Sequence, residues 1–289
     1  MQILANGIIS GLTIAVLALA YLVVFLPTRV FHVALGAIYA LVPYVAWSCG
    51  QRGLPTAVAI ALSLLTGALL SLGCELFNHA WLEKKQAAPG AHLISSLGVY
   101  IMIVQVAILI WGNGTRQLRQ GADTVLQFVT LSLPTSQVVS AIVAVTILVW
   151  FCLWLRFSSL GLQFRALADN PKEFGLQGYN MDKLRLLAFG LSGLLASISS
   201  LLVAYDIGFD PQSGLPVLLM AIVAVIIGSQ QSFVGAVLGG LVLGVVRVAT
   251  VWFLSARWQE AATFLVLVFF LLIRPNGLMG HKPRVEAEV

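Results

Sequence analysis

Charged residues are scarce in this chain of 289 residues, at 9% against 60% hydrophobic residues. Soluble domains carry roughly 25% charged residues, so this composition excludes a soluble globular fold. The apolar runs are continuous, whereas the strands of a membrane β-barrel alternate between apolar and polar residues. The sequence therefore predicts an all-α, polytopic membrane protein that forms one transmembrane domain over residues 1–289.

Sequence motifs for chemistry within the chain are also lacking. No G-x-x-x-x-G-K-[ST] motif occurs, and none of the five lysines follows a glycine, so no P-loop nucleotide site is expected. The acidic residues lie in loops or at the ends of apolar runs, which disfavours a paired-carboxylate site. The histidines show no metal-ligand spacing; they are His32, His79, His92 and His281. We expect no enzyme, no catalytic residue, no cofactor and no metal.

Cysteines number three, and each lies within or at the end of an apolar run. Buried cysteine usually behaves as a small hydrophobic residue, so we expect Cys49, Cys74 and Cys152 to pack rather than to form disulfides. No Lys or Arg precedes Arg29, so no cleavable signal peptide is expected. The net charge of +5 is better explained by loops at a membrane surface than by nucleic-acid binding.

Nine apolar segments indicate about eight to nine transmembrane helices, since a spanning helix needs about 20 apolar residues. They cover residues 7–26, 30–50, 55–77, 91–111, 136–155, 185–205, 214–228, 232–254 and 259–273. The seventh segment is short enough to be re-entrant. If all nine span, eleven of the sixteen basic residues share one side with the C-terminus. The positive-inside rule then predicts an external N-terminus and a cytoplasmic C-terminus.

A polar segment at about residues 156–184 interrupts the apolar runs. Residues 161–169 have a helical pattern, and Asn170-Pro171-Lys172-Glu173 is typical of a second helix start. Gly178 is suited to ending that helix. The segment predicts a helix, a break and a short helix in the cytoplasm. It is either a solvated connector or a stiff element that docks onto an ATP-hydrolysing partner.

Two ionisable residues lie within apolar runs, where a charge costs about 2.5–3.5 kcal/mol at the helix centre. Glu75 is near one end of its run, and we expect it to reach the membrane interface. Arg247 either extends outward to the interface or faces a pathway and meets an acidic group. Nearby, Gly235/Gly239 and Gly240/Gly244 form two small-xxx-small patterns, which indicate close helix–helix contact.

Three stretches carry a resemblance to a known family: RFSSLGLQFRALADNPKEFGLQGYNMDKLRLLAFGLSGLLA from Arg156, GAVLGGLVLGVVRV from Gly235 and IRPNGLMG from Ile273. The chain resembles the permease subunits of bacterial branched-chain amino acid ABC importers. The N-terminal half matches more loosely, through Asn6-Gly7 and SSLGVYI from Ser95. It also departs from the family's N-F-A-H-G, of which only Ala34 and Gly36 remain. Arg247 stands where the family often has an acidic residue.

The resemblance implies an importer in the bacterial inner membrane, with two permease subunits, two ABC ATPase subunits and an external substrate-binding protein. By this analogy the ATPase-coupling residues are Ala166, Asp169, Asn170, Pro171, Gly175 and Gly178. The pathway between the permeases, surrounded by membrane lipid, would involve Ala34, Gly36, Gly239, Gly240 and Arg247. The small-molecule substrate would be a branched-chain or other amino acid, an amide or urea, selected mainly by the binding protein. The alternatives are a self-sufficient carrier or channel, and a membrane scaffold without transport activity.

Overall fold

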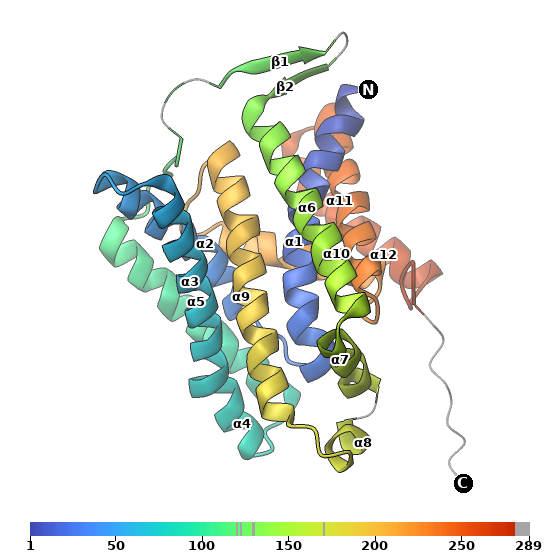
Figure 1. Ribbon diagram of the computed structural model, residues 1–289. Coiled ribbons are helices and arrows are strands. Elements are labelled where there is room, and N and C mark those ends of the chain that lie inside the picture. The colour runs from blue at the N-terminus through green and yellow to red at the C-terminus, as the bar shows by residue number, and fades with distance from the viewer. Residues whose placement is uncertain (120, 122, 129–130, 170, 281–289) are drawn as a thin grey trace.

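Helices form nearly all of the computed structural model, which describes residues 1–119, 121, 123–128, 131–169 and 171–280 (Figure 1). This confirms the predicted all-α, polytopic membrane fold. The longer helices are α1 (Gln2–Thr28), α2 (Ala34–Gln51), α3 (Thr56–Cys74), α5 (Pro89–Trp111), α6 (Thr135–Phe157), α9 (Met181–Asp206), α10 (Gly214–Gly228), α11 (Phe233–Phe253) and α12 (Gln259–Ile273). All nine predicted apolar segments are therefore helical.

Seven helical segments are long and apolar enough to cross a membrane. They are α1, the continuous segment from α3 through α4 (Thr56–Lys84), α5, α6, α9, α11, and α12 with the short 3-10 turn η2 (Ala256–Trp258) before it. Helix α10 is apolar but has 15 residues, and α2 is not among the seven. Whether α10 crosses the membrane completely stays a prediction.

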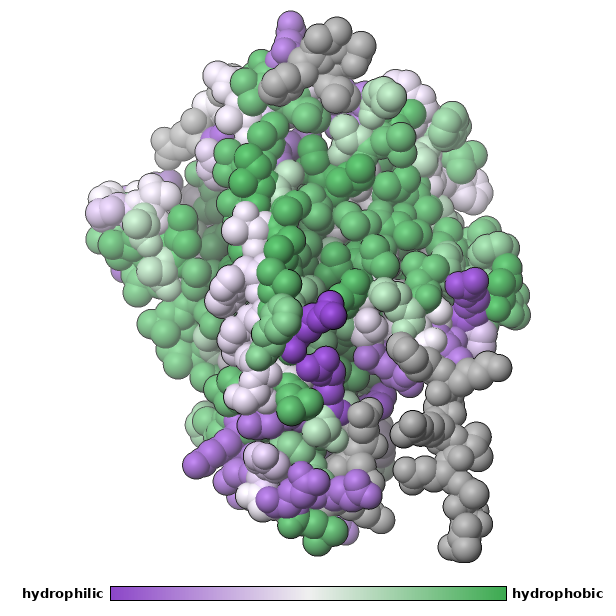
Figure 2. Space-filling view, turned by 45° about the vertical axis from the view of Figure 1, so that its right-hand side comes forward, coloured by the Kyte–Doolittle hydropathy of each residue, from purple (hydrophilic) through white to green (hydrophobic). Residues whose placement is uncertain are grey.

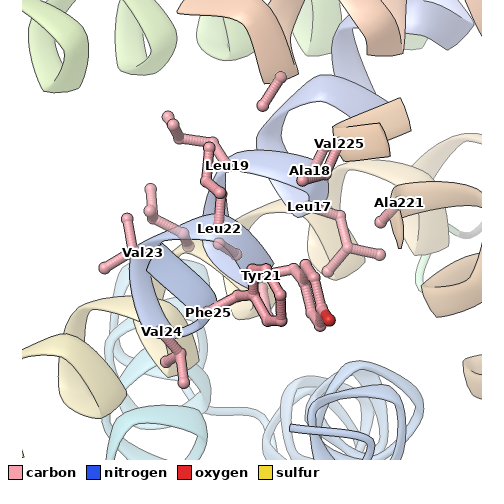
Figure 3. Packing of buried hydrophobic residues seen from close by; sticks show 14 of the residues in the cluster. Leu17, Ala18, Leu19, Tyr21, Leu22, Val23, Val24, Phe25, Ala221 and Val225 are labelled. Carbon is pink, nitrogen blue, oxygen red and sulfur yellow. The ribbon is translucent and has the colours of Figure 1, made fainter. Parts of the chain in front are cut away.

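Helix α1 is the centre of the bundle, with 72% of its most apolar 18-residue window buried. One face of α1 packs on α11, where a Cβ built on Gly240 would lie 2.6 Å from the Cα of Ala15. Figure 3 shows another face, where Leu17 and Ala18 lie near Ala221 and Val225 of α10. The predicted close contact at Gly240 and Gly244 is confirmed, because both glycines meet the α1 backbone directly.

The outer helices present apolar side chains to their surroundings. Only 22%, 28% and 6% of the apolar windows of α5, α6 and α12 are buried. Figure 2 shows a broad hydrophobic surface over the body of the molecule, with hydrophilic residues gathered at its lower end. A large exposed apolar surface bounded by polar residues is what a bilayer requires of a membrane-spanning bundle.

The polar segment between α6 and α9 forms two short helices, α7 (Ser159–Asp169) and α8 (Pro171–Leu176). The predicted order of helix, break and short helix is confirmed, and Gly178 has the positive φ of 81° that favours glycine after a helix. Asn170, predicted as the cap of the second helix, lies outside the described residues. Both helices lie at one end of the bundle (Figure 1), called here the α7/α8 end.

A small β-hairpin marks the opposite end and was not predicted. Strands β1 (Val125–Phe128) and β2 (Leu131–Pro134) pair antiparallel between α5 and α6. The hairpin lies beside the N-terminus (Figure 1), where the Gln2 amide donates to the Ser132 carbonyl over 2.9 Å and accepts from the Ser132 N–H over 3.1 Å. This end, called here the hairpin end, therefore holds the start of α1.

Candidate translocation cavity

A half-open cavity of about 520 Å³ lies among the membrane-spanning helices. Its lining includes Asn6 and Ser10 near the start of α1, Gln137 near the start of α6, and Asp206 at the end of α9. These four positions all belong to the hairpin-end half of their helices. The cavity therefore lies largely in the hairpin-end half of the bundle, and its lining extends to Thr13 and Tyr39.

One face of α1 supplies much of the polar lining. Asn6, Ser10 and Thr13 follow one another at spacings of four and three residues, so they share one face of the helix. Gly7 and Gly11 form the neighbouring face, which packs directly on α11. Helix α1 thus divides its surface between close packing and a polar wall. The sequence analysis did not identify this wall, although the spacing of its residues was visible.

Two opposite charges line the same cavity. Asp206 accepts a hydrogen bond from the Ser136 hydroxyl over 2.8 Å, and Arg247 donates one to the Thr263 hydroxyl over 3.2 Å. Within the described residues, neither charge has an ion-pair partner within 4.0 Å. Arg247 also borders a smaller cavity of about 120 Å³, which Glu260 lines as well. Arg247 is half-buried at these cavities, and within the part of the chain that the structure describes it forms no ion pair with the acidic group expected of a pathway arginine.

The other residues assigned to the pathway by resemblance are packing residues in this structure. The Ala34 N–H donates to the Ser96 hydroxyl over 2.9 Å, and Gly36 lies against Gly214 of α10. Gly239 contacts the α10 backbone at Ala224, and Gly240 contacts α1. Of the five predicted pathway residues, Arg247 alone lines the 520 Å³ cavity. A pathway role for the other four stays a prediction.

The α7–α8 segment is held on the bundle by buried aromatic and aliphatic side chains. Phe164, Leu167 and Phe174 are almost fully buried, and Phe174 stacks on Tyr179 with ring centroids 5.0 Å apart. Ala166 and Gly178 are exposed, while Gly175 is half-buried near Met181. The backbones of Asp169 and Pro171 belong to α7 and α8. A fixed segment with an exposed outer face is compatible with docking, but its coupling role stays a prediction.

Glu75, expected at the membrane interface, is paired within the bundle. It is buried, and its carboxylate accepts a bond of 2.7 Å from the guanidinium of Arg185 on α9. A distant basic residue therefore compensates the charge, which no local sequence pattern could indicate. Helix α3 continues beyond Glu75 as a π-helical turn, η1 (Glu75–His79), and then as α4 (Ala80–Lys84). The position of Glu75 at the membrane interface stays a prediction.

Three histidines that are distant in sequence lie together at the α7/α8 end. The ring centroids of His32 and His79 are 5.6 Å apart, and those of His79 and His92 are 5.5 Å apart. Burial, and secondarily the neighbouring His79, hold the pKa of His32 well below its usual value. Among the described residues, no three His, Cys, Asp or Glu side chains are placed to hold a metal ion. His281 lies outside them.

Comparison with known proteins agrees with this architecture. Residues 3–273 match the family model described as branched-chain amino acid transport system / permease component. The chain is 26% identical to the permease protein LivH of Salmonella typhimurium and to BraD of Pseudomonas aeruginosa, covering 99% of this chain and 97% of each relative. It is 30% identical to the autoinducer 2 import permease LsrC of Escherichia coli, covering 85% of this chain and 71% of LsrC.

A solved structure has the same fold. PsaBC from Streptococcus pneumoniae in complex with Fab superposes with a TM-score of 0.54 at 13% identity, covering 96% of this chain and 93% of that chain. The family match over almost the whole chain, together with the apolar helical bundle, is decisive. The chain belongs to the family of permease components of branched-chain amino acid transport systems.

Proposed function

We propose that this chain is the permease subunit of an ABC importer that takes a small polar solute, above all a branched-chain or related amino acid, across the bacterial inner membrane. ATP hydrolysis in a partner subunit would provide the energy. The proposal rests on the family, on relatives whose names describe import permeases, and on the 520 Å³ cavity with its two unpaired charges. The cavity is the structural observation that supports this proposal most strongly.

The cavity has the chemistry of an amino acid site. A free amino acid carries an ammonium and a carboxylate, which Asp206 and Arg247 complement in charge. Apolar residues complete the lining, including Ile14, Leu202 and Met220, and they suit a branched aliphatic side chain. Buried or half-buried charges need partners, so a zwitterionic solute would stabilise both. A single inorganic ion would leave one of them unpaired.

The two ends of the bundle have different proposed partners. The α7–α8 segment at one end would dock on the ABC ATPase, with its exposed positions Ala166 and Gly178 in the interface. The hairpin end, which is the end nearer the cavity, would face the external substrate-binding protein. This orientation puts the N-terminus outside and the C-terminus in the cytoplasm. It agrees with the positive-inside bias of the sequence.

A second permease subunit would cover the open side of the cavity. Polar and charged residues within a membrane face a protein interior or water rather than lipid. A half-open cavity lined by Asn6, Asp206 and Arg247 therefore needs a cover, which a homologous permease would supply. The solute would then pass between the two subunits, and the outer surfaces of α5 and α12 would remain in contact with lipid.

Uptake by the reconstituted transporter tests the assignment of the cavity. Asp206→Asn and Arg247→Gln should each raise the leucine concentration for half-maximal ATP-driven uptake about tenfold or more, because a hydrogen bond to a charged group contributes about 1.5–3 kcal/mol. Arg257→Gln is the matched control, since Arg257 is exposed and does not line the cavity.

The solute can be varied in the same assay at saturating binding protein. Leucinamide lacks the carboxylate, so it should compete less well than leucine in the parent, and Arg247→Gln should reduce that difference. Unchanged uptake in both cavity variants would refute the assignment of the cavity. Uptake driven by an ion gradient, without ATP or an ATPase, would instead favour the carrier or channel alternative.

A further inference from the structure

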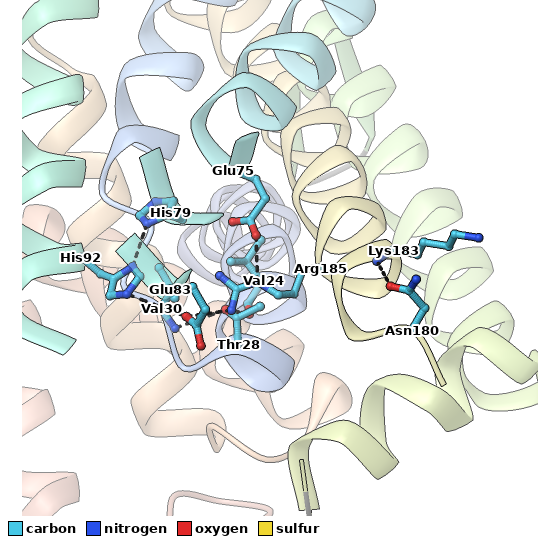
Figure 4. Close-up of polar contacts among 10 residues, drawn as sticks. All are labelled: Val24, Thr28, Val30, Glu75, His79, Glu83, His92, Asn180, Lys183 and Arg185. Carbon is cyan, nitrogen blue, oxygen red and sulfur yellow. Dashed lines mark hydrogen bonds and ion pairs between the residues drawn. The ribbon is translucent and has the colours of Figure 1, made fainter. Parts of the chain in front are cut away.

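A second group of charged residues lies at the α7/α8 end, and Figure 4 shows its polar contacts. It is called here the Arg185 cluster, and it consists of Glu75, His79, Glu83, His92 and Arg185. The side chain of Arg185 is only 10% exposed and that of Glu75 only 3%. None of the five lines the 520 Å³ cavity. Proposed solute contacts therefore do not account for these residues.

Arg185 joins three separate elements. Its Nε donates to the Glu75 carboxylate in η1 over 2.7 Å, and its Nη1 lies 3.0 Å from the Glu83 carboxylate in α4. Glu83 in turn lies 3.8 Å from Nε2 of His92 in α5, and the Nδ1 atoms of His92 and His79 are 3.3 Å apart. A single side chain of α9 thus holds the whole turn from the end of α3 to the start of α5.

The place of Arg185 in the chain links this cluster to the α7–α8 segment. Helix α9 follows α8 after the short connection of residues 177–180. It starts at Met181, where the Asn180 side chain accepts a 3.0 Å hydrogen bond from the Lys183 N–H. Arg185 lies about one turn further on. A displacement of α8 therefore reaches Arg185 through a four-residue connection and a capped helix start.

A close helix contact extends this connection into the bundle. A Cβ on Gly193 would overlap the carbonyl oxygen of Gly67, and Ser71 lies against the same position. Helices α3 and α9 thus touch at the backbone in their middle and are joined by charges at one end. Helix α7 packs mainly on α1 and α6 and also touches α9. Helix α8 leads into α9, which packs on both α1 and α3.

Buried ion pairs are weak contributors to stability and are best attested where they fix a geometry. The cluster also retains buried polar atoms without partners among the described residues, including Oε2 of Glu75 and Nη2 of Arg185. We infer that Arg185 is a positioning residue that makes α9 and the η1–α4–α5 turn move as one body. Resting on the proposed function, the inference is that displacement of α8 by the ATPase moves the η1–α4–α5 turn together with α9.

A distance measurement on the chain in a bilayer tests this link without any partner. Spin labels at Trp81 in α4 and Leu187 in α9, both exposed, report the separation of the two elements once Cys49, Cys74 and Cys152 are replaced by alanine. The parent should give one narrow distance distribution. Arg185→Gln should broaden or split it, because the bridge is lost.

Lys183→Gln is the matched control, because Lys183 lies on the same turn of α9 and points away from the cluster in Figure 4. It should leave the narrow distribution unchanged. Should Arg185→Gln fail to fold, Glu83→Gln provides the second test, since it leaves the bond to Glu75 in place and alters a carboxylate that is 57% exposed. An equally narrow distribution in every folded cluster variant would overturn the inference.

Uptake per ATP hydrolysed provides a readout that a merely structural residue would not change. In the assembled transporter, Arg185→Gln should lose uptake while hydrolysis continues, whereas Lys183→Gln should keep both. If the parent complex showed no ATP-driven uptake, the proposed function would fail. The distance measurement would still decide whether Arg185 joins the two elements, so the two failures are distinguishable.

Discussion

Gly240 on α11 provides the most direct test of the packing at the centre of the bundle. A Cβ at this position would lie 2.6 Å from the Cα of Ala15, 2.7 Å from its nitrogen and 2.8 Å from its Cβ. Ordinary contact begins at 3.4 Å, so Gly240→Ala requires α1 and α11 to separate by about 0.8 Å. Backbone atoms cannot rotate away as a side chain would.

Overpacking of this kind costs about 1–3 kcal/mol, and we expect Gly240→Ala to lower the free energy of unfolding by about that amount. Gly98→Ala on α5 is the matched control: Gly98 is helical and exposed, with no atom within 4 Å of its built Cβ. The control should stabilise the helix by about 0.5–1 kcal/mol. Thermal unfolding in detergent measures the stability of both variants. Equal shifts of the unfolding temperature, of the same sign in Gly240→Ala and Gly98→Ala, would refute the packing argument.

Three further predictions concern the α7/α8 end. Gly175→Trp should reduce solute-stimulated ATP hydrolysis in the assembled transporter without lowering the unfolding temperature, because Gly175 lies in the proposed docking segment; unchanged hydrolysis would contradict that role. Asn180→Ala should cost about 1 kcal/mol of unfolding free energy through loss of the α9 cap, and an unchanged unfolding midpoint would contradict it. His32 has a lowered pKa in the folded chain, so the unfolded state binds more protons and stability should fall below about pH 6.5. Thermal unfolding at several pH values should show that His32→Gln weakens this loss, and an identical pH dependence would contradict it.

The sequence predicted the helices well because their signals are local. Every apolar run became a helix, and the pattern around Pro171 and Gly178 predicted α8 and its end. The glycine spacing on α11 predicted its contact with a neighbouring helix. The glycine spacing could not identify α1 as that neighbour, because the partner of a small-xxx-small face depends on the arrangement of the whole bundle.

The site depended on contacts between residues that are distant in sequence. Asp206 and Arg247 line one cavity from different helices, and Glu75 meets a partner 110 residues away. Hydropathy describes each run by itself and places Glu75 merely near a helix end. The four-residue strands β1 and β2 were missed because segments so short give little periodicity.

ATP-driven uptake in proteoliposomes tests the central proposal most directly. The chain would be reconstituted with its co-purifying ATPase and second permease, the external binding protein, and labelled leucine on the binding-protein side. The account predicts leucine accumulation that requires ATP on the opposite side and is weakened by Arg247→Gln, while the Arg257→Gln control retains it. Accumulation by the chain alone, driven by an ion gradient and indifferent to ATP, would contradict the account.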